Sequence, residues 1–246
     1  MKKGKKITIL GAGNVGATIA YTMTMDARAS EIVLIDINKD KAKGEAMDIY
    51  QGTSFARSVN ISAGDYEDAR DSDIVIVTVG AARKPGQSRI DLAQGNVNII
   101  RSVMPQVAAF AAKAGYIVVS NPVDILTYAT IKFTGLPESQ VIGSGTTLDS
   151  SRLRARIADH VGLPPQNVHA NVFGEHGDSA MIPWSLTTIA GMPMETYCAS
   201  ICEKHNNCGK IELSEIEDDV RNSGANVIKL KVDGSVQSYN YLFPGF

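Results

Sequence analysis

The sequence predicts an α/β protein in which a doubly wound parallel sheet is followed by a second domain of mixed structure. Three observations support this prediction. Short apolar runs alternate with segments of helical periodicity up to about Gly143, a glycine-rich turn follows the first apolar run, and the alternation changes beyond Gly143. A chain of 246 residues is long enough for two modest domains with a real core. We therefore expect one domain at 1–143 and a second at 144–246.

Each apolar run predicts a strand, and each periodic segment predicts a helix. The run at 73–80 is almost continuously apolar, as expected of a strand that is buried on both faces of a parallel sheet. Strands are expected at 7–10, 32–35, 59–62, 73–80, 116–120 and 141–143. Helices are expected after the glycine turn and at 39–50, 92–113 and 123–134. The second domain should contain a helix at 150–161, a strand at 167–173 and a helix at 218–231.

The glycine turn has the pattern Gly11-x-Gly13-x-x-Gly16. Gly11 permits a tight turn, Gly13 lets the backbone approach a pyrophosphate, and Gly16 lets the helix pack closely on the strand. Asp36 ends the next apolar run, 20 residues after Gly16, where a carboxylate accepts from ribose hydroxyls and repels a 2′-phosphate. Together these features predict a Rossmann domain that binds NAD. A glycine-rich turn in another kind of α/β domain stays open as the alternative.

Composition excludes several classes of function. The formal net charge of −2 gives no general attraction to nucleic acid or to an anionic membrane. The basic residues at the N-terminus are not followed by an apolar segment long enough for a signal region or a membrane span, so a cytoplasmic protein is expected.

The cysteines lie close together in the second half of the chain. There are three, too few and too clustered for a disulfide framework. On a helix Cys198, Cys202 and His205 would share a face, and Cys208 follows, so a zinc site is the alternative to free thiols. Because the C-x-x-C spacing typical of structural zinc is absent, we expect reduced thiols and no metal.

Four motifs resemble those of one family. They are GAGNVG at 11–16, SNPVD at 120–124, IGSGTTLDSSR at 142–152 and GEHGD at 174–178. Together they are similar to the L-lactate and malate dehydrogenases, and above all to bacterial L-lactate dehydrogenases, from about Lys5 to Lys231. The resemblance implies an NAD-dependent 2-hydroxy acid dehydrogenase of glycolysis and fermentation, of the L-lactate type, that transfers hydride reversibly between NADH and pyruvate. It also implies a homotetramer.

The resemblance implies a role for each reactive residue. His176 would be the general acid–base, and an ordinary histidine pKa near 6.5 suits that role. Asp149 would hold the other ring nitrogen and stabilise the imidazolium. Arg152 would bind the substrate carboxylate with two parallel hydrogen bonds, and Arg89 would polarise the carbonyl. Substrate binding is assigned to Arg83, Arg89, Asn121, Asp124 and Arg152. Cofactor binding is assigned to Gly11, Gly13, Val15, Gly16, Asp36, Lys41, Tyr66, Gly80, Ala81, Val119, Asn121 and Ser144.

Arg83 favours a different substrate. It lies in the 81–91 loop, which would close over the site, where lactate dehydrogenases usually carry a neutral residue and malate dehydrogenases carry arginine. An arginine would pair with the second carboxylate of oxaloacetate, whereas an unpaired charge in a closed site is costly. Malate dehydrogenase is therefore the alternative, unless Arg83 belongs to a solvated basic turn.

Arg154 and His169 favour lactate. They match positions where allosteric bacterial lactate dehydrogenases bind fructose 1,6-bisphosphate between subunits, and two cations across a two-fold axis suit phosphates. Two ordinary surface residues are the alternative.

The end of the chain departs from the family. Residues 232–246 do not match its pattern, so we expect an incomplete α+β substrate domain, through a frameshift or a chimeric reading frame. A catalytically inactive NAD-binding remnant is therefore a further alternative.

Overall fold

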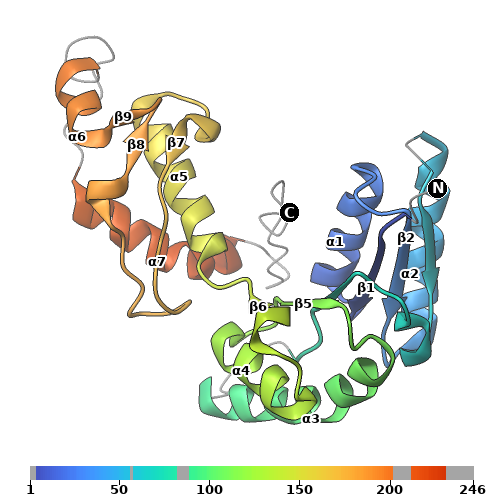
Figure 1. Cartoon of the computed structure of the whole chain (residues 1–246). Coiled ribbons are helices and arrows are strands. Elements are labelled where there is room, and N and C mark those ends of the chain that lie inside the picture. Colours follow the sequence, from blue (N-terminus) through green and yellow to red (C-terminus); the bar gives the residue numbers. More distant parts are fainter. Residues whose placement is uncertain (1–3, 56–57, 82–88, 202–211, 231–246) are drawn as a thin grey trace. The chain divides into compact units, whose positions relative to one another are not determined.

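The computed structural model describes residues 4–55, 58–81, 89–201 and 212–230, without the side chains of Phe55, Arg89 and Ile228. The chain divides into two compact units, and the boundary falls between Ser144 and Gly145 (Figure 1).

The first unit is built on a sheet of six parallel strands. The strands are β1 (Lys6–Leu10), β2 (Glu31–Ile35), β3 (Asn60–Ala63), β4 (Ile74–Val77), β5 (Gly115–Val118) and β6 (Val141–Gly143). Their order across the sheet is β3-β2-β1-β4-β5-β6, and every neighbouring pair is parallel. This is the doubly wound order with the reversal between β1 and β4, and it confirms the predicted fold class.

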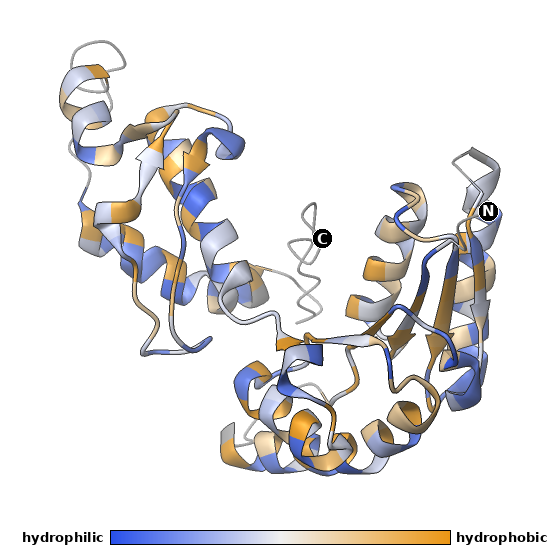
Figure 2. Cartoon of the chain, viewed as in Figure 1, coloured by the Kyte–Doolittle hydropathy of each residue, from blue (hydrophilic) through white to orange (hydrophobic). Residues whose placement is uncertain are grey.

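Helices cover both faces of this sheet (Figure 1). They are α1 (Asn14–Met25), α2 (Lys39–Gly52), α3 (Arg89–Phe110) and α4 (Val123–Thr134), with short 3₁₀ turns η1 (Thr53–Phe55), η2 (Tyr66–Ala69) and η3 (Glu138–Gln140). Successive residues of a strand alternate between the two cores: Ile9 packs in the cluster with α1 and α2, and Leu10 packs in the cluster with α3 and α4. Both sides of the strands are therefore apolar, and Figure 2 shows them as the apolar centre of the unit.

The second unit combines helices with a small sheet. Its elements are α5 (Thr147–Val161), η4 (Pro165–Asn167), β7 (Val168–His169), η5 (Trp184–Leu186), β8 (Thr188–Ile189), β9 (Met192–Pro193), α6 (Met194–Tyr197) and α7 (Leu213–Leu230). The three strands are antiparallel. Their core is shared with α5 and α7, where Leu153 and Ile157 pack with Ile216 and Val220.

The strand expected at 167–173 is largely absent, and this part of the prediction is wrong. Ladder pairing stops at His169, and only Phe173 forms a further bridge, with Met181. Side chains of α5 form hydrogen bonds with the backbone of residues 170–172. Arg154 Nε donates to the Ala170 carbonyl at 2.8 Å, and Ser150 Oγ accepts from the Val172 N–H at 2.9 Å. Helix side chains therefore satisfy this segment in place of a neighbouring strand.

No helix in the described ranges is long and apolar enough to cross a lipid bilayer.

Candidate active site

The glycine turn after β1 has the geometry that its three glycines predict. Gly11 adopts φ +99°, and its N–H donates to the Ile35 carbonyl at 2.7 Å. A Cβ on Gly16 would lie 1.8 Å from the Gly11 carbonyl oxygen, so only glycine fits there. A Cβ on Gly13 would meet nothing within 4 Å, which leaves open space beside the backbone at the start of α1. Free N–H groups at a helix N-terminus bind phosphate, so this turn fits a pyrophosphate.

Asp36 lies directly after β2, beside this turn. Its Oδ2 accepts from the Ala12 N–H at 2.7 Å, and its Oδ1 accepts from the Asn38 N–H at 2.8 Å. Two backbone donors therefore orient the carboxylate and tie it to the glycine turn. Each oxygen keeps a further lone pair, which is what two ribose hydroxyls require.

The other residues assigned to the cofactor follow the carboxyl ends of strands. Val15 lies in the first turn of α1, Lys41 in α2 after β2, Tyr66 in η2 after β3, Gly80 and Ala81 after β4, Val119 and Asn121 after β5, and Ser144 after β6. Parallel strands end at one edge of their sheet, so these positions lie along the edge where doubly wound sheets bind ligands.

Asn96 is a residue that the sequence analysis missed. It lies on α3, it is 3% exposed, and its Oδ1 accepts from the Ala81 N–H at 2.8 Å. Its Nδ2 donates to the Asn121 carbonyl at 2.8 Å. The side chain thus joins the loops after β4 and β5, both assigned to the cofactor. The only signal in the sequence was a polar residue among the apolar positions of a long helix.

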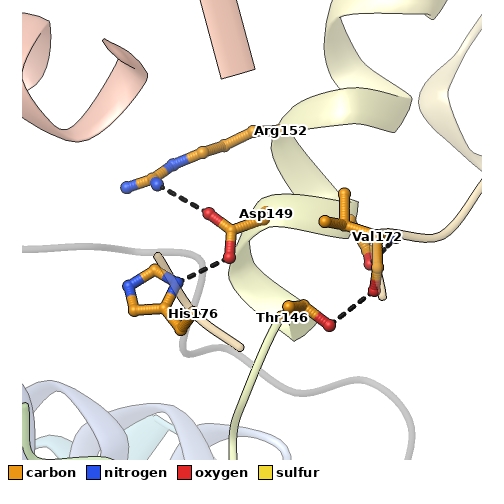
Figure 3. A network of polar contacts seen from close by, with 6 residues as sticks. Thr146, Asp149, Arg152, Val172 and His176 are labelled. Atoms are coloured by element: carbon orange, nitrogen blue, oxygen red, sulfur yellow. Dashed lines mark hydrogen bonds and ion pairs between the residues drawn. The ribbon is translucent and has the colours of Figure 1, made fainter. Parts of the chain in front are cut away.

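The second unit brings together three residues predicted to be catalytic (Figure 3). His176 Nδ1 lies 2.6 Å from Asp149 Oδ2, and Arg152 Nη1 donates to Asp149 Oδ1 at 3.2 Å. Asp149 and Arg152 lie on α5, and His176 lies in the loop between Phe173 and Met181. The side chains are 11%, 13% and 24% exposed for Asp149, Arg152 and His176, so the carboxylate is buried between a cation and a ring that keeps an exposed edge.

This arrangement fixes the chemistry that the imidazole can perform. A carboxylate at Nδ1 favours a proton on that nitrogen, which leaves Nε2 as the nitrogen suited to exchange a proton with a reactant. The carboxylate also stabilises the imidazolium form by its charge. This geometry is the one that a histidine general acid–base requires.

The guanidinium of Arg152 lies beside Gly224 of α7. A Cβ on Gly224 would lie 3.4 Å from Arg152 Nη2, so the glycine leaves room for the arginine. One of its five N–H groups goes to Asp149, and a planar fork of this type binds carboxylates.

Several predicted residues lie outside the described part of the chain. Arg83 is in 82–88, and the side chain of Arg89, the first residue of α3, is not described. Asp124 lies in the first turn of α4. The possible zinc ligands Cys202, His205 and Cys208 are also outside, and the described residues contain no group of three side chains suited to a metal.

Comparison with known proteins decides the family. Residues 5–143 match the model of the lactate/malate dehydrogenase NAD binding domain, and residues 146–239 match that of the lactate/malate dehydrogenase alpha/beta C-terminal domain. The chain belongs to the lactate/malate dehydrogenase family. The second match extends beyond Lys231, where the resemblance in the sequence analysis ended.

Relatives within the family agree. An L-lactate dehydrogenase of Clostridium perfringens is 48% identical over 230 residues, which cover 94% of this chain and 72% of that protein. L-lactate dehydrogenase 1 of Clostridium acetobutylicum is 48% identical over 231 residues, covering 94% and 73%. The structure of a minor L-lactate dehydrogenase from Enterococcus mundtii is similar with a TM-score of 0.88 at 40% identity, covering 97% of this chain and 74% of that one.

As a member of this dehydrogenase family, the chain is an NAD-dependent 2-hydroxy acid dehydrogenase. NAD is the predicted cofactor, and the first domain model confirms it. The open backbone at Gly13, the oriented carboxylate of Asp36 and the close packing at Gly16 all fit a bound dinucleotide.

Proposed function

We propose that this chain is an NAD-dependent L-lactate dehydrogenase that interconverts pyruvate and L-lactate, with His176 as its acid–base. The relatives reported above are named for that activity. Residues 1–143 would bind NAD, and residues 144–246 would form the substrate domain. The observation that carries the proposal is the 2.6 Å contact between His176 and Asp149, with Arg152 on the same carboxylate.

The residues divide the reaction between them. Bound NADH supplies the hydride that the carbonyl carbon of pyruvate takes up. His176, as the imidazolium, gives its Nε2 proton to the carbonyl oxygen and becomes neutral. Asp149 stabilises the charged ring before the transfer and keeps its orientation through it. Reduction therefore uses one NADH and one proton for each lactate formed.

Substrate binding is assigned to arginines. Arg152 would bind the carboxylate of pyruvate with two parallel hydrogen bonds. Arg89 would stabilise the negative charge that develops on the carbonyl oxygen, and Asn121 and Asp124 would also bind the substrate. Arg83 would face solvent when pyruvate is bound.

The cofactor roles are proposed on the same basis. The glycine turn would bind the pyrophosphate, and Asp36 would bind the ribose hydroxyls. The other residues of the proposed cofactor site are Val15, Lys41, Tyr66, Gly80, Ala81, Val119, Asn121 and Ser144.

Regulation by fructose 1,6-bisphosphate stays part of the proposal. Arg154 donates to the Ala170 carbonyl and, at 2.8 Å, to Asn171 Oδ1, while His169 is exposed on β7. A phosphate would therefore use His169 and the remaining N–H groups of Arg154. The homotetrameric state and cytoplasmic location expected from the sequence also stay predictions.

The test is NADH oxidation by the purified protein with pyruvate and with oxaloacetate, with and without fructose 1,6-bisphosphate. We expect a higher kcat/KM for pyruvate, raised further by the sugar bisphosphate. A preference for oxaloacetate would mean that Arg83 sets specificity and that the enzyme is a malate dehydrogenase. NADH binding without turnover of either acid would mean an inactive NAD-binding protein.

A further inference from the structure

Two hydroxyl groups at the start of α5 hold both backbone groups of one residue, Val172, in the segment that leads to His176. Thr146 Oγ1, at the start of α5, donates to the Val172 carbonyl at 2.5 Å. Ser150 Oγ accepts from the Val172 N–H at 2.9 Å. Both backbone groups of one residue are therefore bonded to one turn of the helix (Figure 3). We call these two side chains the Thr146–Ser150 hydroxyl pair.

The hydroxyl pair lies between the two halves of the catalytic contact. Asp149 is the residue before Ser150 on α5, and His176 is four residues after Val172. The bridge between Phe173 and Met181, with N···O distances of 2.9 Å in both directions, closes the loop that carries His176. The relative position of Asp149 and His176 thus depends on how α5 holds Val172.

Among the described residues, the backbone of Val172 is not held by hydrogen bonds of a β-ladder. Strand β7 ends at His169, so Val172 has no paired strand within the described structure except through the neighbouring bridge at Phe173. Ser150 is 8% exposed and Val172 is 4% exposed, so loss of either hydroxyl leaves a buried backbone group without its partner. The backbone around Val172 would then shift until this group forms a hydrogen bond with another partner.

A small shift matters for this contact. A charge-assisted bond of 2.6 Å between His176 and Asp149 depends on distance and on ring orientation. Displacement of a catalytic group by about 1 Å costs on the order of a hundredfold in rate.

We propose that Thr146 and Ser150 are positioning residues, which set the contact between His176 and Asp149 by holding the backbone N–H and carbonyl of Val172. This rests on the proposed function, in which that contact performs proton transfer. The hydroxyls touch neither reactant nor cofactor in this role. They act only through the backbone that leads to His176.

Kinetics give the first test. In Thr146→Val and Ser150→Ala we expect kcat with pyruvate to fall about tenfold or more, with KM changed by less than about threefold, because proton transfer is affected more than binding. Thr146→Ser keeps the hydroxyl and should keep kcat within about twofold. Ser151→Ala removes the neighbouring hydroxyl on α5 and is the matched control. NADH affinity and thermal unfolding, measured on each variant, show whether it is folded.

A proton NMR signal gives a second test that needs no turnover. The Nδ1 proton of His176, bonded to Asp149, should give a downfield signal that is absent from His176→Gln. We expect the signal to move upfield or vanish in folded Thr146→Val and Ser150→Ala and to persist in Thr146→Ser and Ser151→Ala. If Ser150→Ala does not fold, the comparison of Thr146→Val with Thr146→Ser tests whether the downfield signal depends on the hydroxyl of residue 146.

Two outcomes would overturn the inference: wild-type kcat in both folded variants, or an unchanged downfield signal in them. Failure of the proposed function is a different result. In that case the wild-type protein turns over neither pyruvate nor oxaloacetate, while the downfield signal still reports whether the hydroxyl pair sets the contact.

Discussion

The Nδ1 atom of His176 lies 2.6 Å from Asp149 Oδ2, and Arg152 donates to the other oxygen of the same carboxylate at 3.2 Å. One buried acid therefore orients both the proton donor and the arginine proposed for the substrate. This contact connects residues 27 positions apart in the chain. It is the feature on which the proposed chemistry depends.

Asp149→Asn should lower kcat with pyruvate by on the order of 10²–10⁴. The amide cannot stabilise the imidazolium by charge, and it permits the wrong ring tautomer. NADH titration should be unaffected. The matched control is Asp159→Asn, an exposed acid on the same helix, which should keep kcat. Equal effects of the two substitutions would contradict the role of Asp149.

Arg152→Lys should raise the KM for pyruvate about tenfold or more, because lysine provides a point charge where a carboxylate needs two parallel donors. Steady-state kinetics at saturating NADH measure this effect. Arg156→Lys alters an exposed contact on the same helix, with Asp219 at 2.6 Å, and should change KM little. An unchanged KM in Arg152→Lys would remove Arg152 from the substrate site.

Gly16→Ala should destabilise the first unit by about 1–3 kcal/mol, because the new Cβ would meet the backbone oxygen of Gly11. Opening the turn should also raise the Kd for NADH about tenfold or more. Gly44→Ala is the control: Gly44 is exposed on α2 with open space around it, and alanine should stabilise that helix by about 0.5–1 kcal/mol. Urea unfolding and NADH fluorescence titration measure both effects, and normal NADH binding by Gly16→Ala would refute the geometry.

The buried Tyr116 should make the free energy of unfolding fall at alkaline pH. Burial raises the pKa of Tyr116 from 10.0 to about 12. The folded protein therefore binds the phenolic proton more tightly than the unfolded chain does. The stabilisation by this protonated phenol is complete below pH 10 and is lost as the pH rises towards about 12. The free energy of unfolding should fall by about 2–3 kcal/mol over that range.

Tyr116→Phe isolates this effect. The variant should lose about 1 kcal/mol below pH 10, with the hydrogen bond to the Ala111 carbonyl, and should show a shallower decline above pH 10. Tyr128→Phe, at an exposed tyrosine, should leave the wild-type pH dependence unchanged. Urea unfolding from pH 8 to 11.5 compares the three proteins, and parallel declines in wild type and Tyr116→Phe would contradict the assignment.

The sequence predicted what local patterns encode. The glycine spacing and Asp36 predicted the turn after β1, and the apolar runs predicted a sheet whose strands are buried on both faces. Gly-Glu-His-Gly-Asp and the Asp149–Arg152 segment identified residues that the structure brings together on α5 and the facing loop.

Contacts made by backbone atoms were not predictable. Asn96 bonds to the backbone of Ala81 and Asn121, and Thr146 and Ser150 bond to the backbone of Val172. Every residue type except proline offers the same backbone N–H and C=O groups, so no sequence pattern marks these partners. The strand predicted at 167–173 fails at 170–172 for the same reason. The apolar alternation of this segment does not reveal that side chains of α5, and not a neighbouring strand, bond to its backbone.

The most direct measurement compares wild-type protein with His176→Gln for NADH oxidation by pyruvate, with NADH binding measured on the same samples. We expect the variant to bind NADH with wild-type affinity and to lose turnover by on the order of 10²–10⁴, because the proton donor at the substrate carbonyl is gone. A variant that keeps wild-type turnover would contradict the central claim that His176, oriented by Asp149, is the acid–base of this dehydrogenase.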